Sequence, residues 1–544
     1  MLTLVSTSAI ASPSDLIRVA VPIGVGIASA AYLTMKAMNK YDSSNADMPI
    51  PTVRIRPGDT SNDAEYDEDN DLFLARCEEE YGLVFNCSMK NQYLTVISGS
   101  LVREIFMTEE LNFMDAVDEI NGFRTFETSV LKSKHGPDSR EIHEIVRDDI
   151  TPFLPMFIPR IMEQLTTIVD DQLGHCENKL IEKPLGIFQD MVAGAMANVF
   201  MGPKIAKDPK VIDSFIQCTY DFAEVVGKDN NKKFWRRFKI RTKYGYMNPL
   251  QKHVRILTDA AAPVVLERRR EETEAAENGV EYVRPLDILQ RLLDNFDKYG
   301  FVDLEDICGH LLILVIASVH TTSDSSSNMC YYLAAFPECI DTLYHEQQQV
   351  LDQIEKERQA SRQKKLESGE VVTEQGFEDT ELDPKNDRDL STSAIKRMVY
   401  MDSFIREILR CRTERLSLAH LARSDVKLSN GMVIPKGRQV HVNIRSVHQG
   451  FDNQDEDPTE FRPWRFVGKP KSATKISKDF LRFGMGRHAC PGRFLAILEM
   501  KAIGSVIVSK YSKIEIQDRS KTKKALFCEL GIPADTGLIF TSRH

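Results

Sequence analysis

The chain has 544 residues with a formal net charge of −10, and 42% of its residues are hydrophobic. This apolar content can build a sizeable core, whereas the acidic balance argues against a nucleic-acid-binding protein. The ten cysteines are scattered without a CxxC pair, which is typical of reduced intracellular thiols rather than of a disulfide framework. No linker or repeat divides the chain, so we expect one large, mainly helical domain over residues 48–544 behind an N-terminal segment.

An uncharged stretch at residues 19–35 is the first feature of the chain. Its length of about 17 residues lies at the short end for a membrane-spanning helix. More positive charges follow it than precede it, which predicts a single-pass anchor within residues 1–47 and the bulk of the protein in the cytosol. Two alternatives remain. One is a signal peptide cleaved near Ala28-Ser29-Ala30, and the other is a mitochondrial transit peptide, which the lack of interspersed arginines disfavours.

The next segments predict an extended connector, a helix and a β-hairpin. Residues 48–57 contain three prolines and should form a stiff, extended connector. Residues 72–81 are expected to form a helix, and residues 83–89 and 92–98 should form a hairpin of two strands.

His143 and Arg147 stand four residues apart in a helix expected over residues 142–152. Side chains at this spacing lie on one helical face. The neighbouring acids Asp148 and Asp149 allow a plain alternative, in which this face is an ordinary solvated surface.

A long helix is expected over residues 302–336. The run from Leu311 to Ala317 is apolar without a break, so we expect it to be buried on all sides. A polar run follows at once, formed by Ser318, His320, Thr321, Thr322, Ser323 and Asp324. Such a run should face something that needs polar groups. Alternatively, its hydroxyls could bond to carbonyls one turn back and bend the helix.

Residues 352–390 are strongly polar and should begin as helix and continue as a flexible insertion. A helix is expected over residues 391–412, where Glu407 and Arg410 share one face. If exposed, this pair would stabilise the helix by only about 0.2–0.5 kcal/mol. Further along, the sequence FRPWRF supplies Arg465.

Between these segments, residues 422–446 alternate around turns at Asn430-Gly431 and Pro435-Lys436-Gly437, which predicts short strands. A local positive stretch then follows in this acidic chain, formed by Lys469, Lys471, Lys475 and Lys478. After Lys510 the chain is expected to return to strands, ending at residues 537–541.

The most informative stretch is FGMGRHACPGRFLA at residues 483–496, with Cys490 at its centre. Its glycines permit positive φ and close approach to a flat or bulky group, and Pro491 turns the backbone. A helix is expected from Phe494, so the thiol lies where a loop becomes a helix. Backbone N–H groups and the helix N-terminus favour a thiolate there. This thiolate could be a nucleophile, a zinc ligand or an axial haem ligand, and a buried structural cysteine is the plain alternative.

The spacing Phe483-x-x-Gly486-x-x-x-Cys490-x-Gly492 resembles the haem-binding loop of the cytochrome P-450 superfamily. With His488 and Pro491, the loop is similar to that of fungal microsomal members of the ent-kaurene-oxidase-like kind. The resemblance covers roughly residues 45–544. It implies the cytochrome P-450 fold, mainly α with small β-sheets, preceded by the N-terminal membrane anchor helix.

The resemblance also implies roles for single residues. Cys490 would be the axial ligand of the haem iron. Further haem contacts are implied for Phe483, Gly484 and His488 in the loop and for His143, Arg147 and His420 elsewhere. On the long helix, Ala317 would leave room for a ligand, and Thr321, followed by Thr322, would serve oxygen activation. His320 stands where the family usually has an acid. Glu407, Arg410 and Arg465 would form a buried network behind the loop.

The implied activity is haem-thiolate monooxygenation, with haem b as cofactor. Electrons would come from NADPH through a separate cytochrome P-450 reductase docked at the lysine stretch, with cytochrome b5 as a second candidate partner. The anchor implies the endoplasmic reticulum membrane and a lipophilic substrate, terpenoid or steroid first and fatty acid second. Two other classes stay open. One is a reductase-independent peroxygenase or isomerase of the same fold, which His320 favours, and the other is a non-catalytic haem binder, which Thr321 disfavours.

Overall fold

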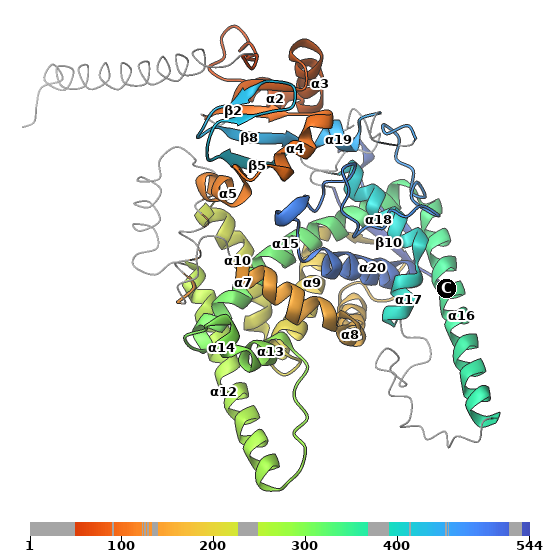
Figure 1. Ribbon diagram of the computed structural model, residues 1–544. Coiled ribbons are helices and arrows are strands. Elements are labelled where there is room, and N and C mark those ends of the chain that lie inside the picture. Colours follow the sequence, from red (N-terminus) through yellow and green to blue (C-terminus); the bar gives the residue numbers. More distant parts are fainter. Residues whose placement is uncertain are drawn as a thin grey trace, which may run out of the picture.

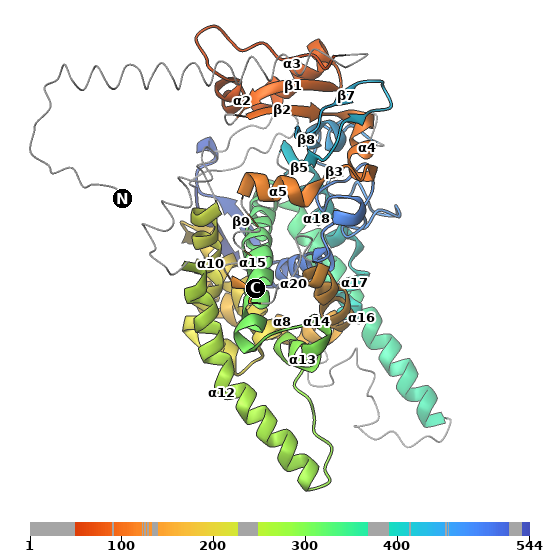
Figure 2. The same ribbon diagram turned by 60° about the vertical axis from the view of Figure 1, so that its left-hand side comes forward.

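The computed structural model describes residues 49–89, 92–121, 123, 127, 130–132, 140–226, 249–367, 391–412, 415–451, 454, 456–521 and 536–544. Within this part of the chain, helices dominate and three small sheets accompany them. The largest sheet and its covering helices occupy one end of the molecule, and a helical body occupies the other (Figures 1 and 2). The predicted class, mainly α with small β-sheets, is confirmed.

The five-stranded sheet has the order β1-β2-β8-β5-β3. Its strands are β1 (Val84–Met89), β2 (Gln92–Ile97), β3 (Leu111–Asn112), β5 (Leu416–Ala422) and β8 (Gln439–Asn443). Strands β1 and β2 pair antiparallel as predicted, whereas β2 and β8 are parallel and join segments far apart in the sequence. The helices α2 (Asp63–Glu68) and α3 (Asn70–Tyr81) adjoin β1, and Phe73 and Leu74 of α3 are buried with Phe85 and Val96.

Helix α15 (Leu304–Ala335) runs through the helical body (Figure 1). Asp303 caps it by accepting a hydrogen bond from the Asp306 N–H. Its neighbours include α9 (Pro184–Met201), α10 (Pro209–Val226), α12 (Pro249–Glu277) and α20 (Arg493–Lys510), and α8 (Leu154–Gln172) packs against α9 and α20. Their apolar faces form one continuous core, which includes Val192, Phe215, Leu312 and Ile503. The predicted long helix is thus confirmed, with ends within two residues of those expected.

The remaining elements flank this body. The helices are α4 (Val102–Met107), α5 (Phe113–Asn121), α13 (Ile288–Asp294), α14 (Phe296–Tyr299), α16 (Glu338–Glu367) and α19 (Ile444–His448). A three-stranded sheet contains β4 (Lys179–Ile181), β9 (Tyr511–Ile516) and β10 (Leu538–Ser542), and β6 (Val426–Lys427) pairs with β7 (Val433–Ile434). The predicted strands after Lys510 and around Asn430-Gly431 are therefore confirmed.

Three expected elements differ from the structure. Residues 391–412 form two helices, α17 (Thr392–Arg397) and α18 (Val399–Cys411), because the backbone leaves the helical region at Met398, with ψ of 89°. Residues 444–448 are helical rather than strand, since Asn443 accepts a hydrogen bond from the Ser446 N–H and caps α19.

The third difference concerns residues 142–152. This segment is α7 (Arg140–Ile145), then a π-turn at Val146–Ile150, then a 3-10 turn at Thr151–Phe153. Pro152 has no N–H to donate to a carbonyl one turn back, so the α-helical hydrogen-bond pattern is interrupted there. The wider π-turn also changes which side chains share a face.

Several predicted segments lie outside the described residues. These are the anchor at residues 19–35 and most of the insertion at residues 352–390, of which only the part within α16 is described. Among the described helices, α15 alone is long and apolar enough to cross a membrane, but most of its apolar part is buried in the core.

Candidate functional site

The loop that carries Cys490 is held by its own backbone. The Cys490 N–H donates to the Phe483 carbonyl at 2.8 Å, and the Gly484 N–H donates to the Leu481 carbonyl at 2.9 Å. Gly484 and Gly486 have φ of 68° and 69°, which side-chain-bearing residues rarely adopt. Helix α20 begins at Arg493, so Cys490 lies three residues before a helix, where the sequence predicted it.

The Cys490 sulfur is surrounded by groups that act in opposite directions. Burial raises the pKa of the thiol, whereas hydrogen bonds from the backbone N–H groups of Gly492 and Arg493 lower it. The positive charges of Arg493 and Arg482 also lower it. These donors are the backbone groups that the glycine-rich loop was expected to aim at the sulfur, and they would stabilise a thiolate ligand.

Midway along α15, one strip of the helix surface is exposed, although most of the helix is buried. Ala317, His320 and Thr321 are exposed, whereas Val315, Val319 and most later side chains of the helix are buried. The three exposed residues follow the spacing i, i+3, i+4, so they share one face. The expectation that Ala317 is buried on all sides is therefore wrong, because the buried run ends at Val315 and none of the described elements covers this face.

The polar residues of this strip differ in their bonding. The Thr321 hydroxyl donates to the Ala317 carbonyl at 2.8 Å, which is the bond to a carbonyl one turn back that the sequence allowed. Thr322 is buried, unlike Thr321. His320 is exposed rather than buried in the core. The strip thus presents an imidazole, a hydroxyl and a methyl group together.

The cysteine loop and α15 are neighbours. Helices α15 and α20 pack against each other in the core, through residues that include Met329 and Gly504 (Figure 1). Arg482, at the start of the loop, also reaches the Ser325 hydroxyl, with 3.5 Å between Nη2 and Oγ. Ser325 lies one turn beyond Thr321, so the thiol loop and the exposed strip belong to adjoining parts of the fold.

Two predicted haem contacts, His420 and His488, converge on the ring of Phe113. Both imidazoles lie 5.8 Å from that ring, measured between centroids. His420 is buried in β5, its Nδ1 lies 2.7 Å from the Leu418 carbonyl, and burial lowers its pKa to about 4. His420 is therefore neutral at pH 7 and offers a hydrogen bond rather than a charge.

The other predicted pair, His143 and Arg147, is separated by the start of the π-turn. Arg147 is exposed and binds the Asp148 carboxylate through two hydrogen bonds, at 2.6 and 3.0 Å. Asp148 also pairs with Lys298. The described contacts of Arg147 are thus those of a solvated surface, and its contact with a haem propionate stays a prediction.

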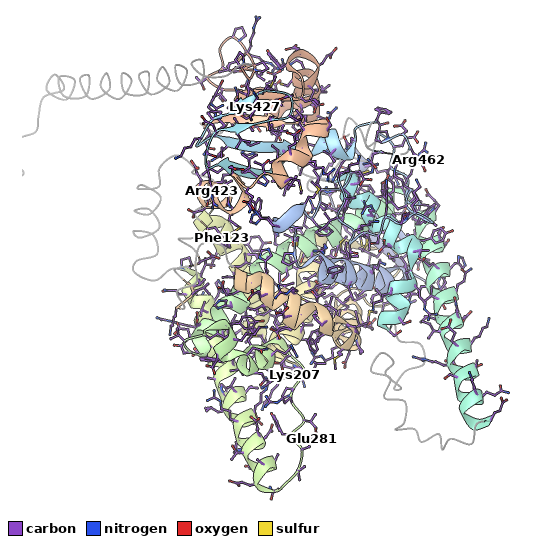
Figure 3. All side chains as sticks on the ribbon, in the orientation of Figure 1. Phe123, Lys207, Glu281, Arg423, Lys427 and Arg462 are labelled. Carbon is purple, nitrogen blue, oxygen red and sulfur yellow. The ribbon has the colours of Figure 1, made fainter. Side chains whose placement is uncertain are left out.

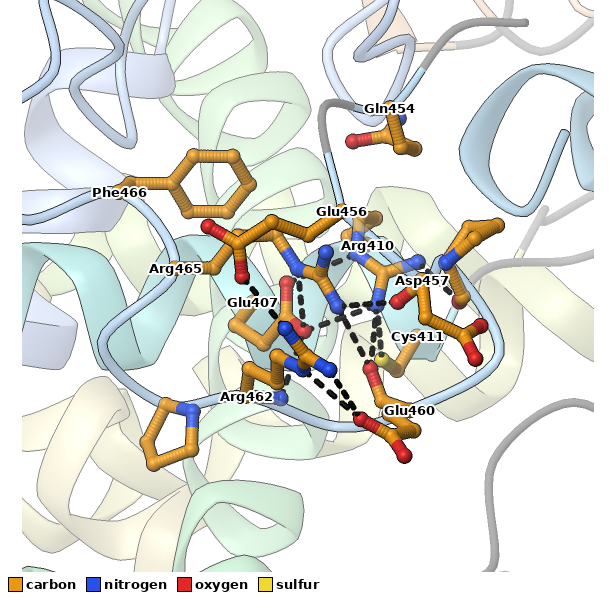
Figure 4. Close-up of polar contacts among 12 residues, drawn as sticks. Glu407, Arg410, Cys411, Gln454, Glu456, Asp457, Glu460, Arg462, Arg465 and Phe466 are labelled. Atoms are coloured by element: carbon orange, nitrogen blue, oxygen red, sulfur yellow. Dashed lines mark hydrogen bonds and ion pairs between the residues drawn. The ribbon is translucent and has the colours of Figure 1, made fainter. Parts of the chain in front are cut away.

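Glu407, Arg410 and Arg465 lie together and are buried (Figure 4). Arg410 binds both carboxylate oxygens of Glu407, at 2.7 and 2.8 Å, and Arg465 Nε donates to the same carboxylate at 3.0 Å. The remaining N–H groups of Arg410 donate to the carbonyls of His448, Pro458 and Glu460. The structure therefore brings the three residues into one network, from two segments more than fifty residues apart.

Two buried residues of this region escaped the sequence analysis. Arg406 lies 4.0 Å from the ring centroid of Phe480 and donates to the carbonyls of Ser472 and Lys475. His448 bonds to both Arg410 and Leu481. The burial of Arg406 could have been inferred only from the apolar periodicity of α18, which places it between buried positions. No sequence pattern indicates that His448 is buried.

The comparisons with known proteins agree with this geometry. The family model described as cytochrome P-450 matches residues 63–367 and 379–537, which is most of the chain. The chain belongs to the cytochrome P-450 family. Its members are haem-thiolate monooxygenases, so the protein is an oxidoreductase of this class.

Fungal relatives and a solved structure support the assignment. The chain is 25% identical to the cytochrome P-450 monooxygenase paxP of Penicillium paxilli, over 81% of this chain and 79% of the relative. It is 27% identical to the cytochrome P-450 monooxygenase AtmP of Aspergillus flavus, over 77% and 74%. The structure resembles a retinoic acid-bound cyanobacterial CYP120A1 with a TM-score of 0.60 and 17% identity, over 92% of this chain and all of that one. The likeness to ent-kaurene oxidases stays a prediction.

The residues present fit the family's haem. Cys490 offers one sulfur with two backbone N–H groups aimed at it, and a Cβ at Gly492 would come within 4.0 Å of that sulfur. Within the described ranges, no cluster of three or more His, Cys, Asp or Glu side chains could hold a metal ion. The candidate site thus consists of a single thiolate and an exposed strip of α15, rather than a multidentate cage.

Proposed function

We propose that the protein oxidises a lipophilic small molecule, using haem b, O2 and electrons from NADPH. Terpenoids or steroids are the first candidate substrates and fatty acids the second. The observation that carries this proposal is the pairing of a loop that aims two backbone N–H groups at the Cys490 sulfur with a helix that exposes only a small, a basic and a hydroxyl side chain. A non-catalytic haem binder would need the loop but not the exposed strip.

Each part of the site has its own task in this proposal. Cys490 holds the haem iron, with the N–H groups of Gly492 and Arg493 fixing its sulfur. The bound haem supplies the oxidising chemistry. Ala317 leaves room for the substrate, and the Thr321 hydroxyl passes a proton toward the reacting oxygen. To do so it must turn away from the Ala317 carbonyl or share its proton with water.

The test is product analysis after a terpenoid, steroid and fatty-acid panel is fed to the membrane-bound protein coupled to a cytochrome P-450 reductase. We expect an oxygenated product that depends on NADPH, on reductase and on O2. Turnover with hydrogen peroxide and none with NADPH would favour a reductase-independent peroxygenase instead. The exposed His320 in place of the family's acid is the observation that keeps this second function in view.

A reductase would dock at the lysine stretch before the cysteine loop. The structure shows that Lys469 pairs with Glu456 and that Lys471 pairs with Asp479. Lys475 donates to the Pro470 carbonyl, and the exposed Lys478 makes no ion pair with the described residues, so this end of the stretch carries the freest positive charge. Lys478→Glu should therefore raise the reductase concentration needed for half-maximal turnover more than Lys469→Glu does. Cytochrome b5 would compete for the same surface.

The proposed location is the endoplasmic reticulum membrane, with the domain facing the cytosol. Deleting residues 1–40 should release the protein from membranes and leave the haem spectrum unchanged. A mature N-terminus near residue 31 would instead identify a cleaved signal peptide.

A further inference from the structure

His448 joins the buried acid–arginine network to the cysteine loop. It ends α19 and is 1% exposed. Its Nδ1 lies 3.1 Å from the Arg410 carbonyl oxygen, and its Nε2 lies 2.7 Å from the Leu481 backbone nitrogen. Because a carbonyl only accepts and a backbone N–H only donates, the ring must carry its proton on Nδ1 and accept at Nε2. A single tautomer therefore satisfies both partners.

The link between His448 and Arg410 runs in both directions. While the ring donates to the Arg410 carbonyl, Arg410 Nη1 donates to the His448 carbonyl at 2.8 Å. The ring also stacks on Phe480, with centroids 5.4 Å apart and planes at 10°. Arg406 lies over that same phenyl ring. The orientation of the imidazole is thus set by α18 on two sides.

A short series of backbone hydrogen bonds lies between this ring and the backbone of Cys490. The Leu481 carbonyl accepts from the Gly484 N–H, and the Phe483 carbonyl accepts from the Cys490 N–H. Two residues before Leu481, the Asp479 carbonyl accepts a hydrogen bond from Gln454 Nε2 at 3.0 Å. The entry of the cysteine loop is therefore fastened to the network through His448.

We propose that His448 is a positioning residue for the thiolate ligand, because its neutral ring fixes the cysteine loop relative to Arg410 and so sets where the Cys490 sulfur is held. This inference rests on Cys490 being the haem ligand. Burial and the charges of Arg410, Arg406 and Arg482 lower the pKa of His448 to about 3, so the ring keeps its acceptor at Nε2 through the neutral range.

The test compares two buried histidines that each make two hydrogen bonds. His448→Phe keeps a flat ring against Phe480 but removes the hydrogen bonds to the Leu481 N–H and the Arg410 carbonyl. The matched control is His253→Phe on α12. His253 is 2% exposed and is bonded to Ser214 and Asp221, both on α10. Both variants should lower the melting temperature, since each strands buried polar groups.

Only His448→Phe should change the metal centre. At a temperature where circular dichroism shows both variants folded, the red-shifted Soret band of its ferrous carbonyl complex should decay about tenfold faster than in the wild type. His253→Phe should decay at the wild-type rate. His448→Gln, whose amide can donate and accept, should recover most of the lifetime.

A wild-type lifetime in His448→Phe, or equal acceleration in both Phe variants, would overturn the proposal. If His448→Phe does not accumulate, His448→Gln and amide exchange of the wild type decide. The Leu481 amide should exchange as slowly as those of α18, and fast exchange there refutes the link. Cys490→Ser tests the ligand assignment separately from the role of His448. A red-shifted band in that variant would show that Cys490 is not the haem ligand at all.

Discussion

Glu407, Arg410 and Arg465 are buried on the side of the site that supports Cys490, and nearly every N–H group of their guanidinium groups has an acceptor. Ala317, His320 and Thr321 are exposed on α15, and the Thr321 hydroxyl bonds only to its own helix. A buried charge must be paired to exist at all, so the first region tolerates little change. The polar groups of the exposed strip on α15 need no buried partners for the chain to fold, so they are available to bound molecules.

The largest effect is expected from removing the thiolate that the buried network supports. Cys490→Ser should abolish the red-shifted Soret band of the ferrous carbonyl complex, because a hydroxyl of ordinary acidity does not replace a thiolate. The visible spectrum of the purified protein measures this. An unchanged band would show that Cys490 is not the ligand.

Glu407→Ala should be nearly as severe, since it strands two buried guanidinium groups. We expect a loss of about 3–5 kcal/mol of stability and little haem-loaded protein. The matched control is Arg462→Ala in the same segment. Arg462 lies at the surface (Figure 3). Its side chain is 43% exposed and pairs with Glu456 and Glu460. Such a pair contributes about 0–1 kcal/mol, so equal losses in the two variants would place Glu407 at the surface.

The neutral ring of His448 predicts a weakness toward acid in the supporting region. Its pKa is about 3 in the folded protein, where Arg410, Arg406 and Arg482 face it, and about 6.5 in the unfolded chain. Because the folded pKa is lowered, the contribution to stability is complete above pH 6.5 and is lost as pH falls toward 3. Between pH 7 and pH 5 this loss amounts to about 2 kcal/mol.

Urea unfolding of the wild type and of His448→Gln at these two pH values measures the effect. The stability difference between the two proteins should shrink by about 2 kcal/mol at pH 5, since glutamine does not titrate. Other buried histidines affect both proteins equally and cancel. A difference that does not change with pH would show that the ring is already charged or is not buried in solution.

Local sequence patterns predicted the features that depend only on residues near one another in the chain. The apolar run before Ser318 gave α15, the glycines and Pro491 gave the cysteine loop, and the spacing of Glu407 and Arg410 gave their shared face. Features that depend on packing from distant segments could not be predicted this way. The exposure of Ala317 depends on which elements fail to cover α15.

The link through His448 shows the same limit. Its ring meets the Arg410 carbonyl from 38 residues away in the sequence, and a lone histidine after a strand carries no periodic signal. The π-turn after Ile145 is a further case, because a helix-like spacing of His143 and Arg147 does not reveal a wider turn between them. Resemblance to a family supplied candidate residues, but the contacts came only from the fold.

The smallest effects on folding, and the sharpest on chemistry, are expected on α15. Thr321→Ala should change stability by less than about 1 kcal/mol, since its hydroxyl is exposed. It should keep the haem spectrum and substrate binding yet divert electrons from NADPH to hydrogen peroxide. The control is Ser323→Ala on the same helix, whose buried hydroxyl makes the same kind of bond, to the Val319 carbonyl. The measurement is the ratio of product formed to NADPH consumed.

His320→Ala then decides whether the imidazole takes the place of the family's acid. As an exposed neighbour of Thr321, it can exchange protons with solvent. If it relays protons, its removal should lower the coupling ratio as Thr321→Ala does. If it does not, His320→Ala should remain coupled at every pH while Thr321→Ala does not. Tight coupling in Thr321→Ala as well would mean that the exposed strip only shapes the substrate site, and the contrast with the buried network would then be one of packing rather than of chemistry.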